Sequence, residues 1–358
     1  MKRIGKNKGV VYGGSDIWEE LNRLIKSTAP SKVICLTDSN TAKYCLPILE
    51  SHLDSDIRIS GITVPAGEAF KTIATCQSVW QQLSDLGTDR KSLMINLGGG
   101  VITDLGGFVA CTFKRGIEFI NIPTSLLAMV DASVGGKNGV DLGHIKNQIG
   151  VIQNPLAVFV DVAFLDTLPQ PERNSGYAEM LKHGLIASEA YWNELKDFHN
   201  MNSDALADAI WKSIEIKNRV VTKDPNEKGE RKTLNYGHTL GHAIESYCLE
   251  SKDREPLLHG EAIAIGMVLA NYISQQMLAF PKVKLQQTTS HFLHHFKRVS
   301  FDLSEIEKII ELLKFDKKNV DGNVNFVLLK DFGNYKIDMT VANDLIFNAF
   351  EYYKNFKN

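Results

Sequence analysis

The sequence lacks the features that mark secreted, membrane-spanning and nucleic-acid-binding proteins. Its five cysteines are scattered and odd in number, and no CxxC pair is present, which argues against a disulfide framework or a sulfur-rich zinc site. No apolar run reaches the roughly 18 residues of a membrane span, and the basic start of the chain has no apolar signal segment. A net charge of −2 offers no basic surface for a nucleic acid. We therefore expect a soluble, cytoplasmic protein with reduced thiols, small-molecule partners, and no nucleic-acid or membrane partner.

What the sequence does contain is enough apolar material for two domains, since 44% of its 358 residues are hydrophobic. Up to about residue 168, short β-branched runs alternate with helical patterns, which predicts a Rossmann-like α/β domain with a mainly parallel sheet. The expected strands are residues 32–37, 57–64, 93–97, 118–122 and 157–161. Two prolines then interrupt the chain, and segments of helical periodicity follow at 176–186, 205–222 and 239–247. We predict an α/β domain over residues 1–168 and a mostly α-helical domain over 169–358.

A glycine-rich junction at residues 93–107, LMINLGGGVITDLGG, is a candidate nucleotide site. An apolar strand leads through three consecutive glycines into a helix start, where backbone amides can approach a pyrophosphate. The spacing is not GxGxxG, so a simple tight turn is the alternative. Asp104 could cap that helix or bind the cofactor. Asp38, after an expected strand, could accept hydrogen bonds from a ribose or cap a helix.

Residues 123–150 gather groups that suit phosphate binding around a second glycine pair. Hydroxyls, lysines, a carboxylate and an amide occur together here: Thr124, Ser125, Asp131, Lys137, Lys146 and Asn147. A solvated loop would explain the lysines, but it would not explain the apolar run at 126–130 beside them. We favour phosphate or substrate binding.

The sequence His238-Thr-Leu-Gly-His242 is the most specific feature of the chain. Two histidines four residues apart share one helix face, and His259 and Glu179 add an imidazole and a carboxylate of the kind that zinc accepts. A protease-type HExxH site is excluded because Thr239 stands where the general-base glutamate would be. A catalytic zinc keeps one position open, so one of the histidines has another role, and the spacing does not choose which.

Further cations and amides flank this motif. Three of these residues precede the motif: Lys217, Arg231 and Asn235. Residues 316–318, DKK, add two lysines. These cations suit a substrate with both carboxylate and phosphate groups. By contrast, HFLHH at residues 291–295 is typical of an ordinary amphipathic helix, with no carboxylate nearby in sequence.

Taken in order, these segments resemble the 3-dehydroquinate synthase family over nearly the whole chain. The matching segments are PAGEAFK (65–71), GGGVITDLGGF (98–108), PTSLLAMVDASVGGKNGV (123–140), KNQIG (146–150), GYAEMLKHGLI (176–186), RKTLNYGHTLGHAIE (231–245), HGEAIAIGM (259–267) and DKK (316–318). The resemblance implies a dehydroquinate synthase-like fold with an NAD-binding first domain and a metal- and substrate-binding second domain. It also implies a phosphate-eliminating lyase of the shikimate pathway, which makes 3-dehydroquinate from 3-deoxy-D-arabino-heptulosonate 7-phosphate.

The resemblance further implies roles for individual residues. Glu179, His238 and His259 would hold Zn2+ or Co2+, which leaves His242 for the substrate. NAD would be surrounded by Asp38, Glu68, Lys71, Gly99, Gly100, Val101, Asp104, Thr124, Ser125, Lys146 and Thr167. The substrate would be surrounded by Asp131, Lys137, Asn147, Lys182, Lys217, Arg231, Asn235, His242 and one of Lys317 or Lys318. Arg115 matches a family arginine that reaches the phosphate of the neighbouring subunit, which implies a homodimer.

Some positions depart from the family pattern: Thr103 replaces a commoner glycine, and Ser125 and Asn138 replace commoner threonines. The hydroxyl at Ser125 is retained, whereas Asn138 bears on the local cofactor contact. Two other enzyme classes share parts of the pattern. One is a sister sugar-phosphate cyclase of the 2-deoxy-scyllo-inosose or valiolone synthase type, and the other is a metal-dependent polyol dehydrogenase that releases NADH.

Overall fold

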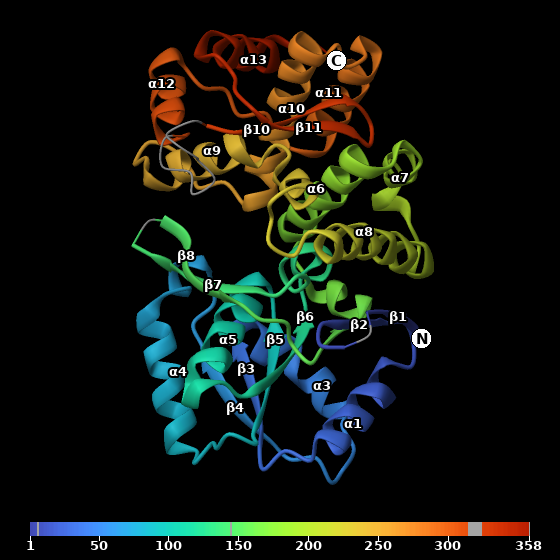
Figure 1. Cartoon of the computed structure of the whole chain (residues 1–358), viewed down its shortest axis with the longest axis vertical. Coiled ribbons are helices and arrows are strands. Elements are labelled where there is room, and N and C mark those ends of the chain that lie inside the picture. Colours follow the sequence, from blue (N-terminus) through green and yellow to red (C-terminus); the bar gives the residue numbers. More distant parts are fainter. Residues whose placement is uncertain (6, 144, 314–323, 358) are drawn as a thin grey trace. The chain divides into compact units, whose positions relative to one another are not determined.

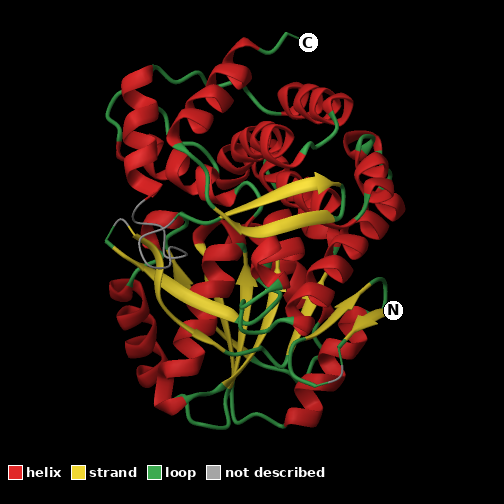
Figure 2. Ribbon diagram, turned by 45° about the horizontal axis from the view of Figure 1, so that its top comes forward, coloured by secondary structure: helices red, strands yellow, loops and turns green. Residues whose placement is uncertain are grey.

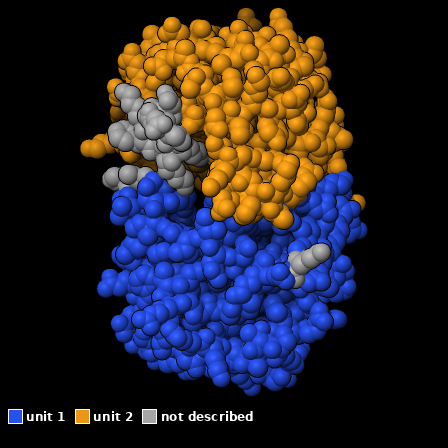
Figure 3. All heavy atoms as spheres, viewed as in Figure 1, with its two compact units in different colours: residues 1–169, 203–218 blue, residues 170–202, 219–358 orange. Residues whose placement is uncertain are grey.

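The computed structural model describes residues 1–5, 7–143, 145–313 and 324–357, and the chain groups into two compact units. The first unit is Met1–Pro169 with Ser203–Asn218, and the second is Gln170–Asn202 with Arg219–Asn358 (Figure 3). Residues 203–218 begin helix α8 (Ser203–Lys223), so this helix contributes to both units. The assignment of separate functions to residues 1–168 and 169–358 stays a prediction.

The first unit is built on a seven-stranded sheet with the order β1-β2-β9-β6-β5-β3-β4 (Figure 1). The strands are β1 (Lys2–Ile4), β2 (Val10–Gly13), β3 (Val33–Asp38), β4 (Ile59–Val64), β5 (Leu93–Gly98), β6 (Glu118–Pro123) and β9 (Ala157–Val160). Only the β1–β2 pair is antiparallel among the strand pairs of this sheet. Every strand expected from the sequence forms, so the prediction of an α/β unit with a mainly parallel sheet is confirmed.

Helices cover both faces of this sheet. In Figure 1, α1 (Ile17–Thr28) and α3 (Leu46–His52) lie on one side, and α4 (Ile73–Asp85) and α5 (Gly100–Thr112) lie on the other. Short helices complete the connections: α2 (Ser39–Tyr44), η1 (Glu68–Phe70), η2 (Phe113–Arg115), η3 (Ala128–Ala132) and η4 (Val162–Thr167). Ile34, Met94 and Leu105 are among the fully buried residues that join the sheet to α4 and α5. This apolar layer fixes the carboxyl ends of β3, β5 and β6, where the predicted nucleotide residues lie.

A hairpin of β7 (Lys137–Leu142) and β8 (Ile145–Ile152) packs on α5. Asn138 anchors it, because the side-chain amide donates to the carbonyl oxygens of Gly136 at 3.0 Å and Gln153 at 2.8 Å. A Cβ atom on Gly107 of α5 would lie 2.6 Å from the side-chain carbonyl carbon of Asn138. The hairpin can therefore approach α5 this closely only because residue 107 has no side chain.

The second unit is mostly helical and also contains the hairpin of β10 (Phe326–Asp331) and β11 (Asn334–Met339), drawn in yellow among the helices of Figure 2. Its longer helices are α6 (Gln170–Ala187), α7 (Glu189–Leu195), α9 (His238–Glu250), α10 (His259–Leu278), α11 (Lys282–His295), α12 (Leu303–Leu312) and α13 (Asn343–Asn355). Helix α10 is its centre and contacts α6, α9, α11, α13 and β10. No helix in the described residues has both the length and the apolar character needed to cross a membrane.

Two glycines let α10 approach its neighbours closely. A Cβ atom on Gly260 would lie 2.6 Å from the carbonyl carbon of Ser175, and the Gly260 N–H donates to Ser175 Oγ at 2.9 Å. Likewise, a Cβ atom on Gly266 would lie 3.1 Å from the carbonyl carbon of Gly237. These contacts hold the start of α10 against α6 and its next turns against the start of α9, which positions the histidines of the candidate site.

Candidate active site

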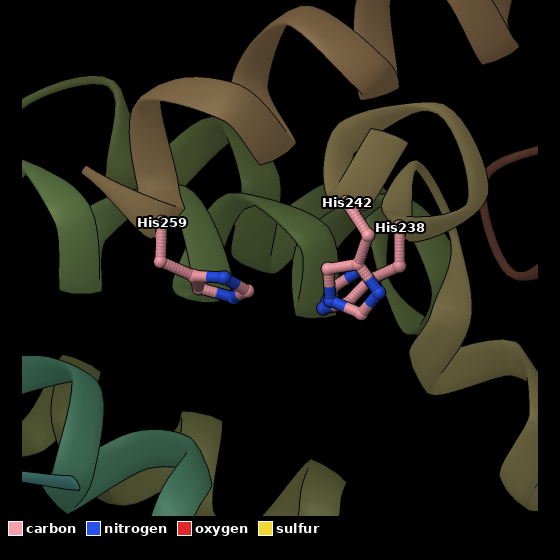
Figure 4. Close-up of side chains that lie close together, drawn as sticks. All are labelled: His238, His242 and His259. Carbon is pink, nitrogen blue, oxygen red and sulfur yellow. The ribbon is translucent and has the colours of Figure 1, made fainter. Parts of the chain in front are cut away.

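Three histidines from two helices converge in the second unit (Figure 4). His238 and His242 lie in the first turns of α9, and His259 is the first residue of α10. One nitrogen of each ring lies within 4.8 Å of one nitrogen of the other two. The predicted helical i, i+4 pair is thus present, and the close packing of α10 on α9 brings the third imidazole to it.

Glu179, fully buried on α6, completes this cluster. Its Oε1 atom lies 3.4 Å from Nε2 of His238 and 3.5 Å from Nε2 of His259, while Oε2 accepts a hydrogen bond from the buried Lys182 ammonium. The two carboxylate oxygens therefore have different partners. Lys182 compensates part of the cost of burying the charge, because an isolated buried carboxylate is strongly disfavoured.

Second partners orient two of the imidazole rings. Nδ1 of His238 lies 3.1 Å from the backbone oxygen of Tyr236, and Nδ1 of His259 lies 3.4 Å from Oε2 of Glu245. Each contact favours a proton on Nδ1, so Nε2 is the ring nitrogen that faces Glu179 Oε1. Burial alone would lower the pKa of His259, but the carboxylates of Glu245 and Glu179 raise it to about 10. A positive charge is thus stabilised at this position.

This donor set fits a divalent metal. Ligands about 2.0–2.2 Å from a tetrahedral zinc lie roughly 3.3–3.6 Å apart, the spacing of Glu179 Oε1 from the two Nε2 atoms. The Nδ1 contacts with a carbonyl and a carboxylate are the partners usually found behind metal-binding histidines. His242 also lies close enough to serve as a ligand, so the geometry admits it beside the three residues implied by the family.

The glycine-rich segment adopts the strand–turn–helix form expected for a nucleotide site. Gly99 is the N-cap of α5, and Gly100 and Val101 form its first turn. A Cβ atom on Gly99 would lie 3.2 Å from Ser125 Oγ, so the hydroxyl lies beside this turn. The open backbone amides and the positive end of the α5 dipole can together receive an anion. Thr103 is buried and hydrogen-bonds back to Gly99 O and Gly100 O, so its hydroxyl is used within the helix.

A second group of predicted cofactor residues surrounds the thiol of Cys45. Burial raises the pKa of this thiol to about 11, and the neighbouring hydroxyls of Thr124 and Thr167 act in the opposite direction. Asp38 lies near enough to add a Coulombic effect, and it caps α2 by accepting from the N–H groups of Asn40 and Thr41. Asp38 is therefore a helix cap in this structure, one of the two roles that the sequence allowed.

A third group forms around Lys71, which is buried between α5 and the β7–β8 hairpin. Its ammonium donates to Asp104 Oδ2 and to Asn147 Oδ1, both at 2.7 Å. Lys146, at the start of β8, lies 3.7 Å from Glu68 in η1. The sequence placed Asn147 with the substrate and the other residues with the cofactor, whereas the structure joins them in one polar network.

The remaining predicted substrate residues lie in two places. In the first unit, the Lys217 ammonium lies 2.8 Å from Asp131 Oδ1. In the second, Arg231 and Asn235 both lie in the short helix η6 (Glu230–Asn235). The buried Arg231 donates to Pro225 O at 2.9 Å, and Asn235 donates to Glu227 Oε1 at 2.9 Å. Lys137 and Arg115 are exposed, and Lys317 and Lys318 lie outside the described residues.

Sequence reasoning missed two acidic residues that organise these groups. Glu245 follows His242 by three residues on α9 and is the partner of His259, so the helical spacing offered a signal for it. Asp141 accepts a hydrogen bond from the Asn147 N–H at 2.7 Å across the β7–β8 hairpin. No local sequence pattern indicates that pairing, since it depends on the register of the two strands.

Known protein families match most of this chain. The family model described as 3-dehydroquinate synthase N-terminal matches residues 61–175, and the one described as 3-dehydroquinate synthase C-terminal matches residues 176–319. A 3-dehydroquinate synthase from Parabacteroides distasonis is 41% identical over 341 residues, which cover 95% of this chain and 96% of the relative. One from a Sulfurovum species is 36% identical over 329 residues, covering 92% and 93% of the two chains.

Solved structures share the fold at lower identity. A 2-epi-5-epi-valiolone synthase from Streptomyces hygroscopicus, solved with NAD+ and Zn2+ bound, has a TM-score of 0.86 at 22% identity and covers 99% of both chains. A 2-deoxy-scyllo-inosose synthase, solved with carbaglucose-6-phosphate, NAD+ and Co2+, has a TM-score of 0.83 at 24% identity and covers 96% of this chain and 98% of its own. These structural likenesses show the fold alone. The family models and the relatives with 36% and 41% identity match the sequence itself. The chain therefore belongs to the 3-dehydroquinate synthase family.

Proposed function

We propose that this chain converts 3-deoxy-D-arabino-heptulosonate 7-phosphate to 3-dehydroquinate and phosphate, with NAD and a divalent metal, zinc or cobalt, as cofactors. The observation that carries the proposal is the buried Glu179 oxygen at 3.4 and 3.5 Å from two oriented imidazoles, in a chain of this family. NAD+ with Zn2+ or Co2+ in the two solved relatives supports the cofactors. We further propose that the enzyme acts as a cytoplasmic homodimer in the shikimate pathway.

In this proposal, Glu179, His238 and His259 hold the metal, and His242 contacts the substrate. A bound metal would supply Lewis-acid chemistry to substrate hydroxyls, and bound NAD would supply reversible hydride transfer. Tyr236 and Glu245 keep both Nε2 lone pairs available by holding the Nδ1 protons. Lys182 donates a hydrogen bond to Glu179 Oε2 and would offset part of the cost of burying that carboxylate.

The proposed nucleotide-binding residues lie in the first unit. Gly99, Gly100 and Val101 would receive the pyrophosphate at the start of α5, with Ser125 beside the turn. The other residues proposed to surround NAD are Asp38, Glu68, Lys71, Asp104, Thr124, Lys146 and Thr167.

Cationic side chains would hold the anionic ends of the substrate. Lys217 and Arg231 are buried cations, and each is held by hydrogen bonds that fix its head group. Fixed cations suit phosphate and carboxylate groups and lose little conformational entropy on binding. Asp131, Lys137, Asn147, Lys182 and Asn235 would complete the set. Arg115 is exposed in η2 at a φ of 71°, and we propose that it reaches the site of a second copy.

The test is to incubate metal-loaded protein with a trace of NAD and 3-deoxy-D-arabino-heptulosonate 7-phosphate, and to follow phosphate and 3-dehydroquinate together. We expect equal amounts of both products without accumulation of NADH. Release of phosphate from glucose 6-phosphate, with no turnover of the heptulosonate, would assign the chain to a sister cyclase. Steady formation of NADH with a polyol would assign it to a dehydrogenase.

A further inference from the structure

The buried Lys71 ammonium is the centre of a polar network that joins three segments of the first unit. The side chain is 5% exposed, and its Nζ atom lies 2.7 Å from both Asp104 Oδ2 on α5 and Asn147 Oδ1 on β8. The Lys71 backbone is tied to the same hairpin, because its carbonyl oxygen accepts from the Asp141 N–H at 2.9 Å. Both ends of Lys71 are therefore fixed relative to the hairpin.

The ammonium is charged in this position. Burial by itself lowers the pKa of Lys71, but the carboxylates of Asp104, Glu68 and Asp141 raise it above its ordinary value. A charged ammonium has hydrogens to donate and no lone pair to accept. The group that faces it must therefore be an acceptor.

This requirement fixes the side-chain amide of Asn147. Its carbonyl oxygen must face Lys71, so its NH2 group faces away, and Asn147 is exposed. The backbone is held as well, since the Asn147 N–H donates to Asp141 Oδ1 at 2.7 Å and the residue has a φ of 54°. Asparagine tolerates this left-handed conformation better than most residues with a side chain. What Asn147 can offer to a ligand through its side chain is then a pair of N–H donors.

We propose that Lys71 is a positioning residue that sets Asn147 as a hydrogen-bond donor, so that Asn147 recognises an acceptor oxygen of the substrate, such as a phosphate, carboxylate or carbonyl oxygen. This inference rests on the proposed function, because it assumes that Asn147 contacts that substrate. It differs from the direct nucleotide contact that the family resemblance implies for Lys71, since two of the three ammonium hydrogens are already used inside the protein.

The same ammonium also binds Asp104, which the proposed function places beside NAD. Loss of Lys71 would leave the partly buried Asp104 carboxylate without this cation, and a charge that loses its partner away from water destabilises the fold. A kinetic effect of substituting Lys71 alone could therefore arise through Asp104 or through Asn147. A double-mutant cycle with Asn147 separates the two.

The experiment compares four proteins: wild type, Lys71→Met, Asn147→Gly and the double variant. Glycine at 147 removes the amide without strain, because it adopts positive φ readily. For each protein we would measure KM for 3-deoxy-D-arabino-heptulosonate 7-phosphate and, in a separate titration, the affinity for NAD alone. Lys26→Met is the matched control, since Lys26 is an α1 lysine with a carboxylate partner, Asp54, outside the network.

We expect Lys71→Met to raise KM about tenfold when Asn147 is present and less than about twofold in the Asn147→Gly background, because one directed hydrogen bond to a charged group is worth about that factor. Lys26→Met should leave KM unchanged. Equal effects of Lys71→Met in both backgrounds would overturn the inference. An inactive wild type would overturn the proposed function and this inference with it, whereas an active wild type with an uncoupled cycle overturns the inference alone.

Asn147→Asp keeps the test decisive if Lys71→Met does not fold. An aspartate at 147 retains the acceptor that faces Lys71 and tolerates the backbone conformation, but it offers no N–H donor to the substrate. We expect KM to rise at least about tenfold while NAD affinity changes less than about threefold. A wild-type KM in this variant would show that no donor is needed, and the inference would fail.

Discussion

Among single residues, His242 and His259 make the sharpest comparison, because both lie close enough to His238 to bind the same metal. Nε2 of His259 lies 3.5 Å from Glu179 Oε1, and its Nδ1 lies 3.4 Å from Glu245 Oε2. We expect His259→Ala to lower bound metal from near one equivalent per chain to less than about one-tenth, and His242→Ala to retain it. Inductively coupled plasma mass spectrometry on dialysed protein measures both.

Arg231→Ala is the control for this comparison. The buried guanidinium donates to Pro225 O and lies in η6, outside the proposed ligand set, so its loss should raise substrate KM and leave bound metal intact. Normal metal content in His259→Ala would reject the ligand assignment. Loss of metal in both histidine variants would instead indicate that all three imidazoles bind the ion.

Glu245 has the clearest separate role at this scale. Its carboxylate lies 3.4 Å from His259 Nδ1 and fixes the tautomer, and partners of this kind typically change metal affinity about 10- to 100-fold. Glu245→Gln should weaken metal binding by that factor while the fold persists. Competition with a chromophoric chelator gives the affinity, and an unchanged value would show that His259 is oriented by packing alone.

The sequence predicted which residues belong to the site better than it predicted their contacts. His238 and His242 could be paired because four residues on a helix always bring side chains to one face. The burial of Lys71 against Asp104 and Asn147 could not be predicted, because Asn147 lies 76 residues later, in a hairpin whose packing on α5 the sequence does not reveal. The role of Asp38 could not be decided from the sequence either, because a carboxylate at this position can cap a helix or bind a ribose.

At the scale of elements, the contact of the β7–β8 hairpin with α5 depends on Gly107. A Cβ atom there would lie 2.6 Å from the Asn138 side-chain carbonyl carbon. We expect Gly107→Ala to lower the free energy of unfolding by about 1–3 kcal/mol, the usual cost of overpacking. Urea denaturation of the purified protein measures this difference.

Asn138→Ala in the same background tests the cause. The substitution removes the atoms that the new methyl group would meet, together with the bonds to Gly136 and Gln153. The effects of the two changes should therefore be less than additive, since residues in contact couple. If the two changes in the free energy of unfolding simply add, the strain of Gly107→Ala arises elsewhere in α5 and not from contact with Asn138.

The sequence predicted the strands of the parallel sheet better than it predicted any other feature of the molecule. Alternating β-branched runs and glycine-rich turns located the parallel strands β3, β4, β5, β6 and β9, because buried parallel strands are apolar on both faces. The hairpins were harder. The strands β10 and β11 in the second unit were not expected, since the helical periodicity around them dominated the prediction.

For the whole molecule, the histidines near the end of α11 predict how stability depends on pH. Burial lowers the pKa of His291 to about 3 and that of His295 to about 4. The charge of His199 lowers both pKa values further, and the charge of Lys196 lowers that of His291. Unfolded histidines titrate near 6.5, so between about pH 6.5 and 4 the unfolded chain binds more protons than the folded one. The free energy of unfolding should therefore fall as the pH is lowered through this range.

Replacing both His291 and His295 with glutamine should flatten this dependence. Chemical denaturation at pH 7, 6, 5 and 4.5 gives the slope for wild type and variant. His294→Gln on the same turn is the control, because that side chain is exposed, and it should change the slope less than the double variant does. If the free energy of unfolding depends on pH equally in the double variant and in wild type, the acid sensitivity comes from other groups.

The close packing of Gly260 on Ser175 also bears on recombination between related genes. The family's N-terminal match ends at Ser175 and its C-terminal match begins at Gly176, which makes that junction an obvious crossover for chimeric enzymes. A crossover there would draw the two contacting backbones from different parents, although Gly260 has no room for a side chain against Ser175. A crossover before Gln170 would inherit α6 and α10 together, with the spacing of Glu179 and His259 preserved.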